Sequence, residues 1–374
     1  MFESLKKIFL IFTLFLSLVL LAGCNKGKTV SETGAVSLKY ATGFKIENLA
    51  GDCKKITDGE KRALLLVPQG EKAPAGYENL PVINTPIKRV VLTSTTQASL
   101  LRPLDELGSI IGVKTEIEGW YMDQIKAGMG NGIIQLVGSG MGPLDYDKIV
   151  ALKPDLVFIS TGGTTDAQTL QKLEELKIPV SVDNCWLEND PLGRLEWIKF
   201  FASFYNKEQQ ASDYFDNSEK NIESITSIVA KEEARPKVTW GLIYQGKAYV
   251  AGIDSYVAKM IAMAGGDYLF KDIKGTGSSA ITVEEYYTKS KEADIYMDDT
   301  MINLGHNTIA NITGQSDVLA DLPAVMKGKV WGFQPWYWQS LDKTDEVIED
   351  LAAIFHPDLF TGYQLKQFTK LPPA

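Results

Sequence analysis

Short apolar and polar runs alternate over residues 40–68, where Ala-Gly-Asp and Asp-Gly interrupt them, and this pattern indicates β-hairpins. From residue 88 the pattern changes. Apolar strands such as 88–94 (KRVVLTS) and 154–160 (PDLVFIS) alternate with stretches that carry apolar residues at helical spacing. Strands separated by single helices predict right-handed crossovers and a mostly parallel sheet. Residues 37–205 are therefore expected to form an N-terminal α/β lobe with an N-terminal β-hairpin addition at 40–68.

A long polar helix is predicted next, because residues 207–234 contain neither glycine nor proline. Arg235-Pro236 ends it, and a second series of strands and helices follows. A chain of 374 residues also exceeds the roughly 250–300 residues at which one core stops growing. The predicted fold class is α/β. Two lobes, each with a central mostly parallel sheet flanked by helices, are joined by one long rigid helix at 206–234, and 235–374 form the C-terminal lobe.

The first residues predict export. Lys6 and Lys7 precede an apolar run that is shorter than the roughly 20 residues of a spanning helix, as in a secretory signal. The run ends in LAGC, which resembles a bacterial lipobox with Cys24 as the acylated residue. We expect a signal peptide at 1–23 and a flexible, lipid-anchored tether at 24–36. An uncleaved anchor helix is the alternative. Either way the body of the protein is expected at the extracytoplasmic face of the cell membrane.

The net charge of the chain limits which binding partners are expected. The formal net charge is −9, and removing residues 1–23 leaves 36 basic and 46 acidic residues, a net charge of −10. A nucleic-acid partner is therefore not expected, since such proteins carry a basic surface. Besides Cys24 only Cys53 and Cys185 occur, and the sequence leaves open whether they form a disulfide.

Glycines, hydroxyls and aromatics gather where predicted strands end, and charged residues are sparse there. In open α/β sheets ligands bind outside the carboxyl ends of the strands. Adjacent aromatics follow strands of both lobes. This favours a ligand cleft with apolar walls over the alternative that these rings only pack at the periphery of the core. In QPWYWQS at 334–340 we expect the Trp336 and Trp338 side chains to lie on the same side of the chain. The candidate ligand-binding residues are Thr95, Thr96, Trp120, Tyr121, Gly163, Trp186, Tyr244, Trp336, Tyr337 and Trp338.

Four segments carry a family resemblance. They are 86–94 (PIKRVVLTS), 137–160 (VGSGMGPLDYDKIVALKPDLVFIS), 249–273 (YVAGIDSYVAKMIAMAGGDYLFKDI) and 348–360 (IEDLAAIFHPDLF). Together they resemble the lipid-anchored or periplasmic substrate-binding proteins of ABC importers for ferric siderophores, haem and vitamin B12. The resemblance covers nearly all of residues 86–360. It implies two lobes, a rigid helix between them, and modest closure around a metal chelate or macrocycle.

The resemblance also implies an ABC permease dimer as partner. Members of this family hold one carboxylate on each lobe, which pairs with arginines of the two membrane subunits. The matching residues here are Asp147, for which Asp145 could substitute, and Glu284, with Glu285 beside it. The alternative is that these acids only complement the dipoles of their helices. The binding protein itself is expected to be a monomer.

The expected cargo is a bulky metal chelate of low net charge, because few basic residues lie at the strand ends. A ferric siderophore is preferred, and a corrinoid or haem stays open, so the metal would be iron or cobalt and belong to the cargo. No resident cofactor is expected. His306 could reach the cleft, but no metal-binding cluster is visible.

Two other functional classes fit the sequence less well. An enzyme is not expected, because the sequence holds no G-x-S-x-G, H-E-x-x-H or dinucleotide-binding glycine motif after a strand. An adhesion or structural lipoprotein would have no deep cleft between its lobes.

Overall fold

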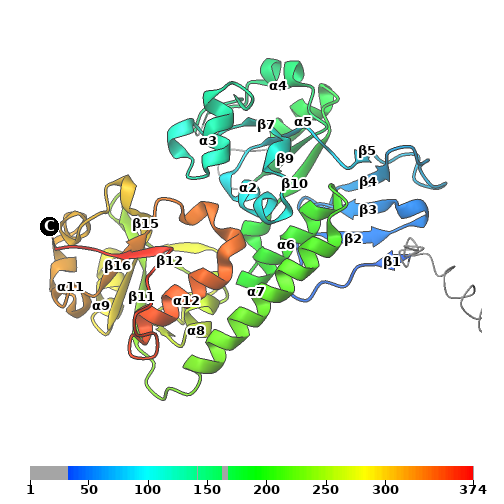
Figure 1. Ribbon diagram of the computed structural model, residues 1–374. Helices are drawn as coiled ribbons and strands as arrows, with labels where there is room; N and C mark the ends of the chain where they lie inside the picture. The colour runs from blue at the N-terminus through cyan, green and yellow to red at the C-terminus, as the bar shows by residue number, and fades with distance from the viewer. Residues whose placement is uncertain (1–32, 141, 162–166, 374) are drawn as a thin grey trace, which may run out of the picture. The chain divides into compact units, whose positions relative to one another are not determined.

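The computed structural model describes residues 33–140, 142–161 and 167–373 of the chain. Its N-terminal part is a five-stranded sheet in the order β1-β2-β3-β4-β5 (Figure 1). The first four strands pair antiparallel, and β5 joins β4 in parallel. The predicted hairpins are thus part of a larger sheet, which extends beyond residue 68. Its strands are β1 Gly34–Ala35, β2 Lys45–Asn48, β3 Lys54–Thr57, β4 Ala63–Pro68 and β5 Val82–Thr85.

The sheet of the N-terminal lobe has the order β10-β9-β6-β7-β8, and all its pairings are parallel, as the alternating pattern predicted. Its strands are β6 Val90–Leu92, β7 Ile110–Val113, β8 Gln135–Leu136, β9 Leu156–Ser160 and β10 Val180–Asp183. Its helices are α2 Thr95–Leu101, α3 Asp123–Gly130, α4 Tyr146–Leu152 and α5 Ala167–Glu175. Short 3₁₀ turns η2 Arg102–Leu104, η3 Leu107–Ser109, η4 Ile117–Gly119 and η5 Cys185–Leu187 follow strands or helices.

Two helices lead from one lobe to the other. The first, α6 Pro191–Ser203, is buried along almost its whole length, and the second, α7 Glu208–Val229, is amphipathic. The observed α7 lies inside the predicted span 206–234. Figure 1 shows α7 running beside α6 and α12, and both neighbours pack against it. Among the described residues, no helix is both long and apolar enough to cross a bilayer.

The sheet of the C-terminal lobe is mixed, with order β14-β12-β11-β15-β16-β17 and β13 beside β11. Strands β11 and β12 form a hairpin, whose turn residues Gln245 and Gly246 have φ values of 51° and 73°. The strands are β11 Lys237–Tyr244, β12 Lys247–Ala251, β13 Asp267–Tyr268, β14 Ser278–Ile281, β15 Ile295–Met301, β16 Val330–Phe333 and β17 Phe368–Lys370. The helices are α8 Tyr256–Met263, α9 Val283–Ser290, α10 Ile309–Thr313, α11 Pro323–Met326 and α12 Thr344–Phe355.

The segment 315–328 does not form one continuous helix. It has a 3₁₀ turn, η7 Asp317–Asp321, followed by the short α11. Pro323 is the reason, because it has no N–H for a continuing helix and holds Leu322 in an extended conformation, with ψ of 131°.

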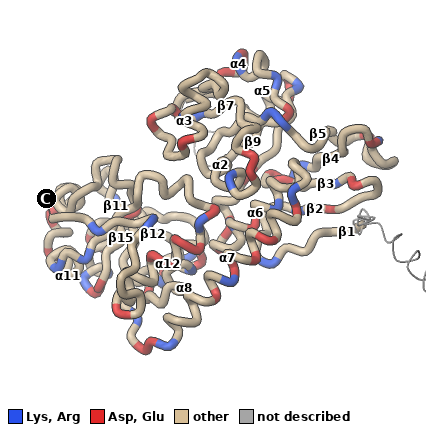
Figure 2. The backbone as a smooth tube through the Cα atoms, in the orientation of Figure 1, with Lys and Arg blue, Asp and Glu red and all other residues tan. Residues whose placement is uncertain are grey.

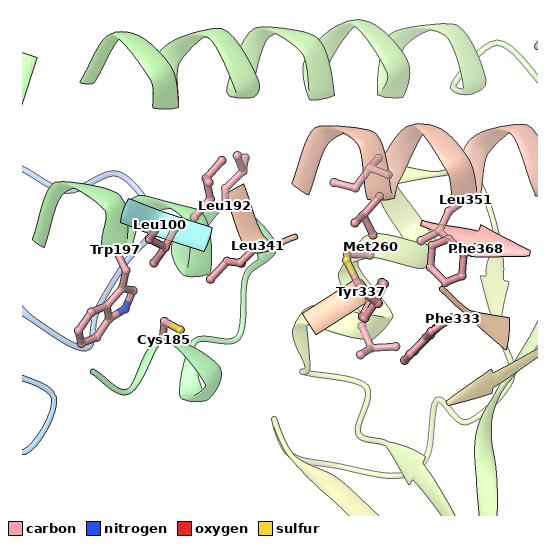
Figure 3. Packing of buried hydrophobic residues seen from close by; sticks show 14 of the residues in the cluster. Leu100, Cys185, Leu192, Trp197, Met260, Phe333, Tyr337, Leu341, Leu351 and Phe368 are labelled. Carbon is pink, nitrogen blue, oxygen red and sulfur yellow. The ribbon is translucent and has the colours of Figure 1, made fainter. Parts of the chain in front are cut away.

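A single hydrophobic cluster runs from the N-terminal sheet through both lobes. Figure 3 shows labelled members in two groups, with Leu192 and Leu341 on one side and Met260 and Tyr337 on the other. The other face of the N-terminal lobe sheet packs a second cluster against α4 and α5. The two lobes therefore meet through buried apolar side chains as well as through the connecting helices.

Two buried carboxylates, one in α6 and one at the end of the turn η5 before it, hold the N-terminal segment in place. Glu196 accepts hydrogen bonds from the backbone N–H groups of Lys39, Tyr40 and Ala41, and Glu188 accepts from Thr42 and Gly43. Although burial opposes ionisation, the hydrogen bonds that Glu196 accepts leave its pKa below the usual value.

Candidate functional site

The rings of Tyr121 and Trp336 face each other across the lobe junction, with their centroids 6.1 Å apart. Each residue is 37% exposed. Tyr121 follows β7 and η4 in the N-terminal lobe, whereas Trp336 follows β16 in the C-terminal lobe. The Tyr121 hydroxyl accepts a hydrogen bond from Asn303 Nδ2 at 3.2 Å, and the Trp336 indole donates to the Lys366 carbonyl. Both rings are therefore held in place while part of their surface stays open.

Hydrogen bonds also join the two lobes at this junction. The Thr96 hydroxyl, at the start of α2, donates to the Trp338 carbonyl at 3.1 Å. Gln339 Nε2 donates to the Gly119 carbonyl at 2.7 Å, and its Oε1 accepts from the Tyr121 N–H at 2.9 Å. Sequence reasoning missed Gln339, since a single glutamine after an aromatic run carries no distinctive signal.

The structure corrects two of the expected cleft residues. Trp120 is 1% exposed, and its indole N–H donates to the Thr115 carbonyl beneath the loop, so it belongs to the core. Tyr337 is 7% exposed and stacks on Phe333 with the ring centroids 4.0 Å apart. In each adjacent pair one aromatic faces inward and anchors the loop that presents the other.

The expectation that Trp336 and Trp338 share a side is also wrong. Residues Tyr337–Gln339 form the 3₁₀ turn η8, with about three residues per turn, so side chains two apart do not align. Trp338 packs edge-on against Tyr337 at 5.0 Å and is half-buried, whereas Trp336 faces Tyr121.

Two more predicted aromatics are exposed at strand ends. Trp186, in η5 after β10, is 43% exposed, and Tyr244, at the end of β11, is 57% exposed. Thr95 is half-buried at the first position of α2. Gly163 and the predicted lipidation residue Cys24 lie outside the described residues.

Both remaining cysteines are buried and unpaired. Burial raises the pKa of both the Cys53 and the Cys185 thiols, which keeps them protonated. The disulfide that the sequence left open is therefore absent.

A small cavity of about 30 Å³, partly open to solvent, lies at the lobe junction. Its lining comes from both lobes and includes Thr96, Arg194, Tyr337, Trp338 and Ser340. Arg194 was not a predicted site residue, because it falls inside a helix rather than at a strand end. A single arginine in the otherwise apolar start of α6 was the available signal.

His306 pairs with a buried carboxylate. Its Nδ1 lies 2.9 Å from Asp298 Oδ2, and Asp298 is 1% exposed. The Asp298 carboxylate raises the pKa of His306, and desolvation raises the pKa of Asp298. Within the described residues, no group of three histidine, cysteine, aspartate or glutamate side chains could hold a metal ion. His306 is thus a single candidate ligand, oriented by one acid.

The two predicted docking acids lie at the starts of helices. Asp147 in the first turn of α4 and Glu284 in the first turn of α9 are both exposed. Neither makes a hydrogen bond or ion pair with another described side chain. Asp145, by contrast, caps α4 by accepting from the Lys148 N–H at 2.9 Å. The cap role occupies Asp145 and leaves Asp147 as the available acid.

Comparison with known proteins extends these observations. A family model described as periplasmic binding protein matches residues 90–335. An uncharacterized lipoprotein of Methanocaldococcus jannaschii is 38% identical over 313 residues, covering 81% of this chain and 73% of that protein.

Two solved structures share the fold. A molybdate periplasmic binding protein of Haemophilus influenzae, bound to molybdate, has a TM-score of 0.62 at 15% identity, covering 83% of this chain and 94% of that chain. A periplasmic heme binding protein of Pseudomonas aeruginosa has a TM-score of 0.57 at 17% identity, covering 76% of this chain and 96% of that chain. The chain belongs to the periplasmic binding protein family, whose members are substrate-binding proteins of ABC importers rather than enzymes.

Proposed function

We propose that this protein captures a bulky metal chelate, preferably a ferric siderophore, between its two lobes and delivers it to an ABC permease. The observation that carries the proposal is the set of exposed aromatics at strand ends of both lobes. Tyr121 and Trp186 come from the N-terminal lobe, and Tyr244 and Trp336 come from the C-terminal lobe. Such rings supply large apolar contact area to a flat or bulky ligand at low conformational cost.

The place of action follows from the N-terminus and from the relatives. LAGC at 21–24 resembles a lipobox, and the archaeal relative is named a lipoprotein. We infer a lipid-anchored protein at the extracytoplasmic face of the membrane. Asp147 and Glu284 would then pair with basic residues of the permease, one from each lobe, which fixes the register of docking.

The absorption spectrum of the full chain, purified in detergent, is the first test, because haem, corrinoids and ferric chelates absorb differently. The second is titration with a ferric trihydroxamate, haemin, cobalamin and molybdate, followed by tryptophan fluorescence. Molybdate is included because Arg194 lies at the junction and the Haemophilus relative binds it. We expect saturable quenching by at least one chelate or macrocycle at micromolar concentration.

Variants of Trp336 and Tyr121, here called wall variants, test the proposed cleft directly. Trp336→Ala and Tyr121→Ala should each weaken binding at least tenfold, since each removes an aromatic face from the site. Met326→Ala is a matched control, because Met326 is 67% exposed on α11 and follows no strand. Absence of quenching by every chelate and macrocycle, or an effect of Met326→Ala equal to that of the wall variants, would contradict the proposal.

A further inference from the structure

The N-terminal sheet β1–β5 contacts the N-terminal lobe through the turn between β3 and β4. This sheet precedes residue 90, where the match to the family model begins, and Figure 1 and Figure 2 show its strands β2 and β3 beside α6. In the turn, the Gly59 N–H donates to the Val182 carbonyl at 2.9 Å, and the Asp58 carboxylate accepts the Val182 N–H at 3.1 Å. The turn thus pairs with the outer edge of β10, the strand that leads into residues 184–188, here called the Trp186 loop.

Asn184 joins this turn to the end of the neighbouring strand β9. It is 3% exposed and follows β10 directly. Its Nδ2 donates to the Glu60 carboxylate at 3.0 Å and to the Gly59 carbonyl at 3.4 Å. Its Oδ1 accepts from the Thr161 hydroxyl at 2.6 Å and from the Thr161 N–H at 3.3 Å. Both hydrogens and both lone pairs of the amide are used, so turning the amide over would place donor against donor and acceptor against acceptor.

The close approach of the turn to Asn184 requires a glycine at residue 59. A Cβ atom on Gly59 would lie 2.9 Å from Asn184 Cβ and 3.0 Å from the Asn184 backbone nitrogen. Asn184 cannot give way without loss, because its amide is held by hydrogen bonds on both sides. A larger residue at this position in the sheet would therefore displace the start of the Trp186 loop.

The far end of the Trp186 loop is fastened to the same N-terminal segment. Glu188 is 3% exposed, and its carboxylate accepts the N–H groups of Thr42 at 2.9 Å and Gly43 at 2.7 Å. Between these two fixed ends the Trp186 side chain is exposed at the end of β10. The N-terminal sheet and the segment before it thus determine where this exposed aromatic lies.

We propose that the N-terminal sheet is part of the cargo site, and that Asn184 is the positioning residue through which it holds Trp186 in the wall of the cleft. This role of Asn184 rests on the proposed function, because that function assigns Trp186 to the cleft. A loop that is already ordered in the free protein loses little conformational entropy when cargo arrives, so its ring contributes more to affinity.

Asn184→Asp separates the two halves of the contact. The aspartate oxygens still accept from Thr161, but they repel the Glu60 carboxylate and cannot donate to the turn. Adding Glu60→Gln supplies a donor opposite the aspartate, whereas Glu60→Gln alone is the matched control, since a glutamine oxygen still accepts from Asn184 Nδ2. Gly59→Ala disturbs the contact from the side of the sheet. Its control is Gly108→Ala, where the added Cβ meets open space.

The first measurement needs no cargo. The full chain in detergent is labelled with fluorotryptophan, and the fluorine NMR line of Trp186 is assigned by its loss in Trp186→Phe. We expect this line to move or broaden in Asn184→Asp and in Gly59→Ala, and to return in Asn184→Asp/Glu60→Gln. Both control variants should leave it in place. An unchanged Trp186 line in Asn184→Asp and Gly59→Ala would overturn the proposal, and if Asn184→Asp does not fold, Gly59→Ala decides.

The second measurement is the affinity for a ferric trihydroxamate, followed by tryptophan fluorescence. Asn184→Asp should weaken binding about tenfold, and Asn184→Asp/Glu60→Gln should recover most of the loss. In a Trp186→Ala background, Asn184→Asp should change the affinity by less than about twofold, because a residue that acts through Trp186 then has nothing to position. An equal loss in both backgrounds, or an unchanged affinity in Asn184→Asp, would overturn the proposal.

Failure of the proposed function gives a different result. In that case the ferric trihydroxamate, haemin, cobalamin and molybdate all fail to bind to wild type, while the fluorine line of Trp186 still responds to Asn184→Asp and Gly59→Ala. Such a result would contradict the proposed function and support the positioning of Trp186 by Asn184 on its own.

Discussion

Arg102 and Asp342 form a bidentate ion pair between the lobes, in which Nε donates to Oδ2 at 2.8 Å and Nη2 donates to Oδ1 at 2.6 Å. The Asp342 side chain is 4% exposed and that of Arg102 is 32% exposed. The Tyr214 hydroxyl of α7 donates to the backbone carbonyl of Asp342 at 2.8 Å. The N-terminal lobe, the connecting helix and the C-terminal lobe thus meet at one residue.

Replacing Arg102 should therefore lower the stability of the folded protein. Arg102→Met leaves the Asp342 carboxylate buried without its partner, and we expect a loss of about 2–3 kcal/mol in the free energy of unfolding. The value is at the low end for buried pairs because Arg102 is partly exposed. Urea unfolding measures it. The double variant Arg102→Met/Asp342→Leu should recover at least half of the loss, and a double variant less stable than Arg102→Met would refute this account of the pair.

Substitutions of the adjacent aromatics Trp336 and Tyr337 should differ in their effects on cargo affinity and on stability. Tyr337→Ala removes a buried ring stacked on Phe333 and should cost about 3–5 kcal/mol of unfolding free energy. Trp336→Ala removes a partly exposed ring and should cost less than about 1.5 kcal/mol while weakening cargo binding. Urea unfolding and fluorescence titration of both variants make the comparison. Equal stability losses would show that both rings are core.

The alternation of strands and helices was enough to predict the parallel sheet of the N-terminal lobe, and a span without glycine or proline was enough to predict the connecting helix. It could not predict which aromatic of each adjacent pair points inward. Trp120-Tyr121 and Trp336-Tyr337 follow strands, so the period of two that orients side chains on a strand no longer applies there. Whether a ring is buried then depends on partners distant in sequence, such as Phe368, whose ring centroid lies 5.5 Å from that of Tyr337.

Arg194 illustrates a second limit. The prediction placed ligand contacts at strand ends, where basic residues are scarce, and on that ground favoured cargo of low charge. The structure brings a helical arginine to the junction from α6, because α6 packs between the lobes. Contacts of this kind depend on how the connecting helices pack, which no local sequence pattern encodes. The charge of the cargo is therefore less constrained than the strand ends alone suggested.

Asp183 should make stability depend on pH. Burial raises the pKa of this carboxyl to about 6, above its ordinary value. An aspartate in the unfolded chain has a pKa of about 4. Between about pH 4 and pH 6 the folded protein therefore keeps a proton that the unfolded chain has released. The free energy of unfolding falls as the pH rises through this range, by up to about 1.4 kcal/mol per pH unit. Asp183→Asn should therefore be more stable than wild type at pH 8, by at most about 3 kcal/mol, and similar to it at pH 4. Urea unfolding at both values tests this, and a variant less stable at pH 8 would contradict it.

Asp147 and Glu284 should affect delivery and not capture. Asp147→Lys and Glu284→Lys reverse the charge on the two proposed docking surfaces, and either should lower uptake by the cognate ABC permease in proteoliposomes at least tenfold. Cargo affinity in solution should stay unchanged, because neither acid lies in the cleft. Asp321→Lys, an exposed acid at the end of η7, is the control and should leave uptake unaffected. Normal uptake by both docking variants would leave these acids as helix-dipole partners only.

Gln339 should control how firmly the Tyr121 loop is held. Gln339→Met keeps the length of the side chain but removes the hydrogen bonds to the Tyr121 N–H and the Gly119 carbonyl. These groups are partly buried, so we expect a stability loss of about 1–2 kcal/mol and at least tenfold faster hydrogen exchange at the Tyr121 amide. Hydrogen–deuterium exchange of a peptide spanning 117–125 measures the rate. Gln334→Met is the matched control, since the Gln334 side chain makes no hydrogen bond within the described residues, and it should leave the exchange rate unchanged. If exchange at Tyr121 were equally slow in Gln339→Met, the loop would be held by its own core anchor, Trp120, and not from the opposite lobe.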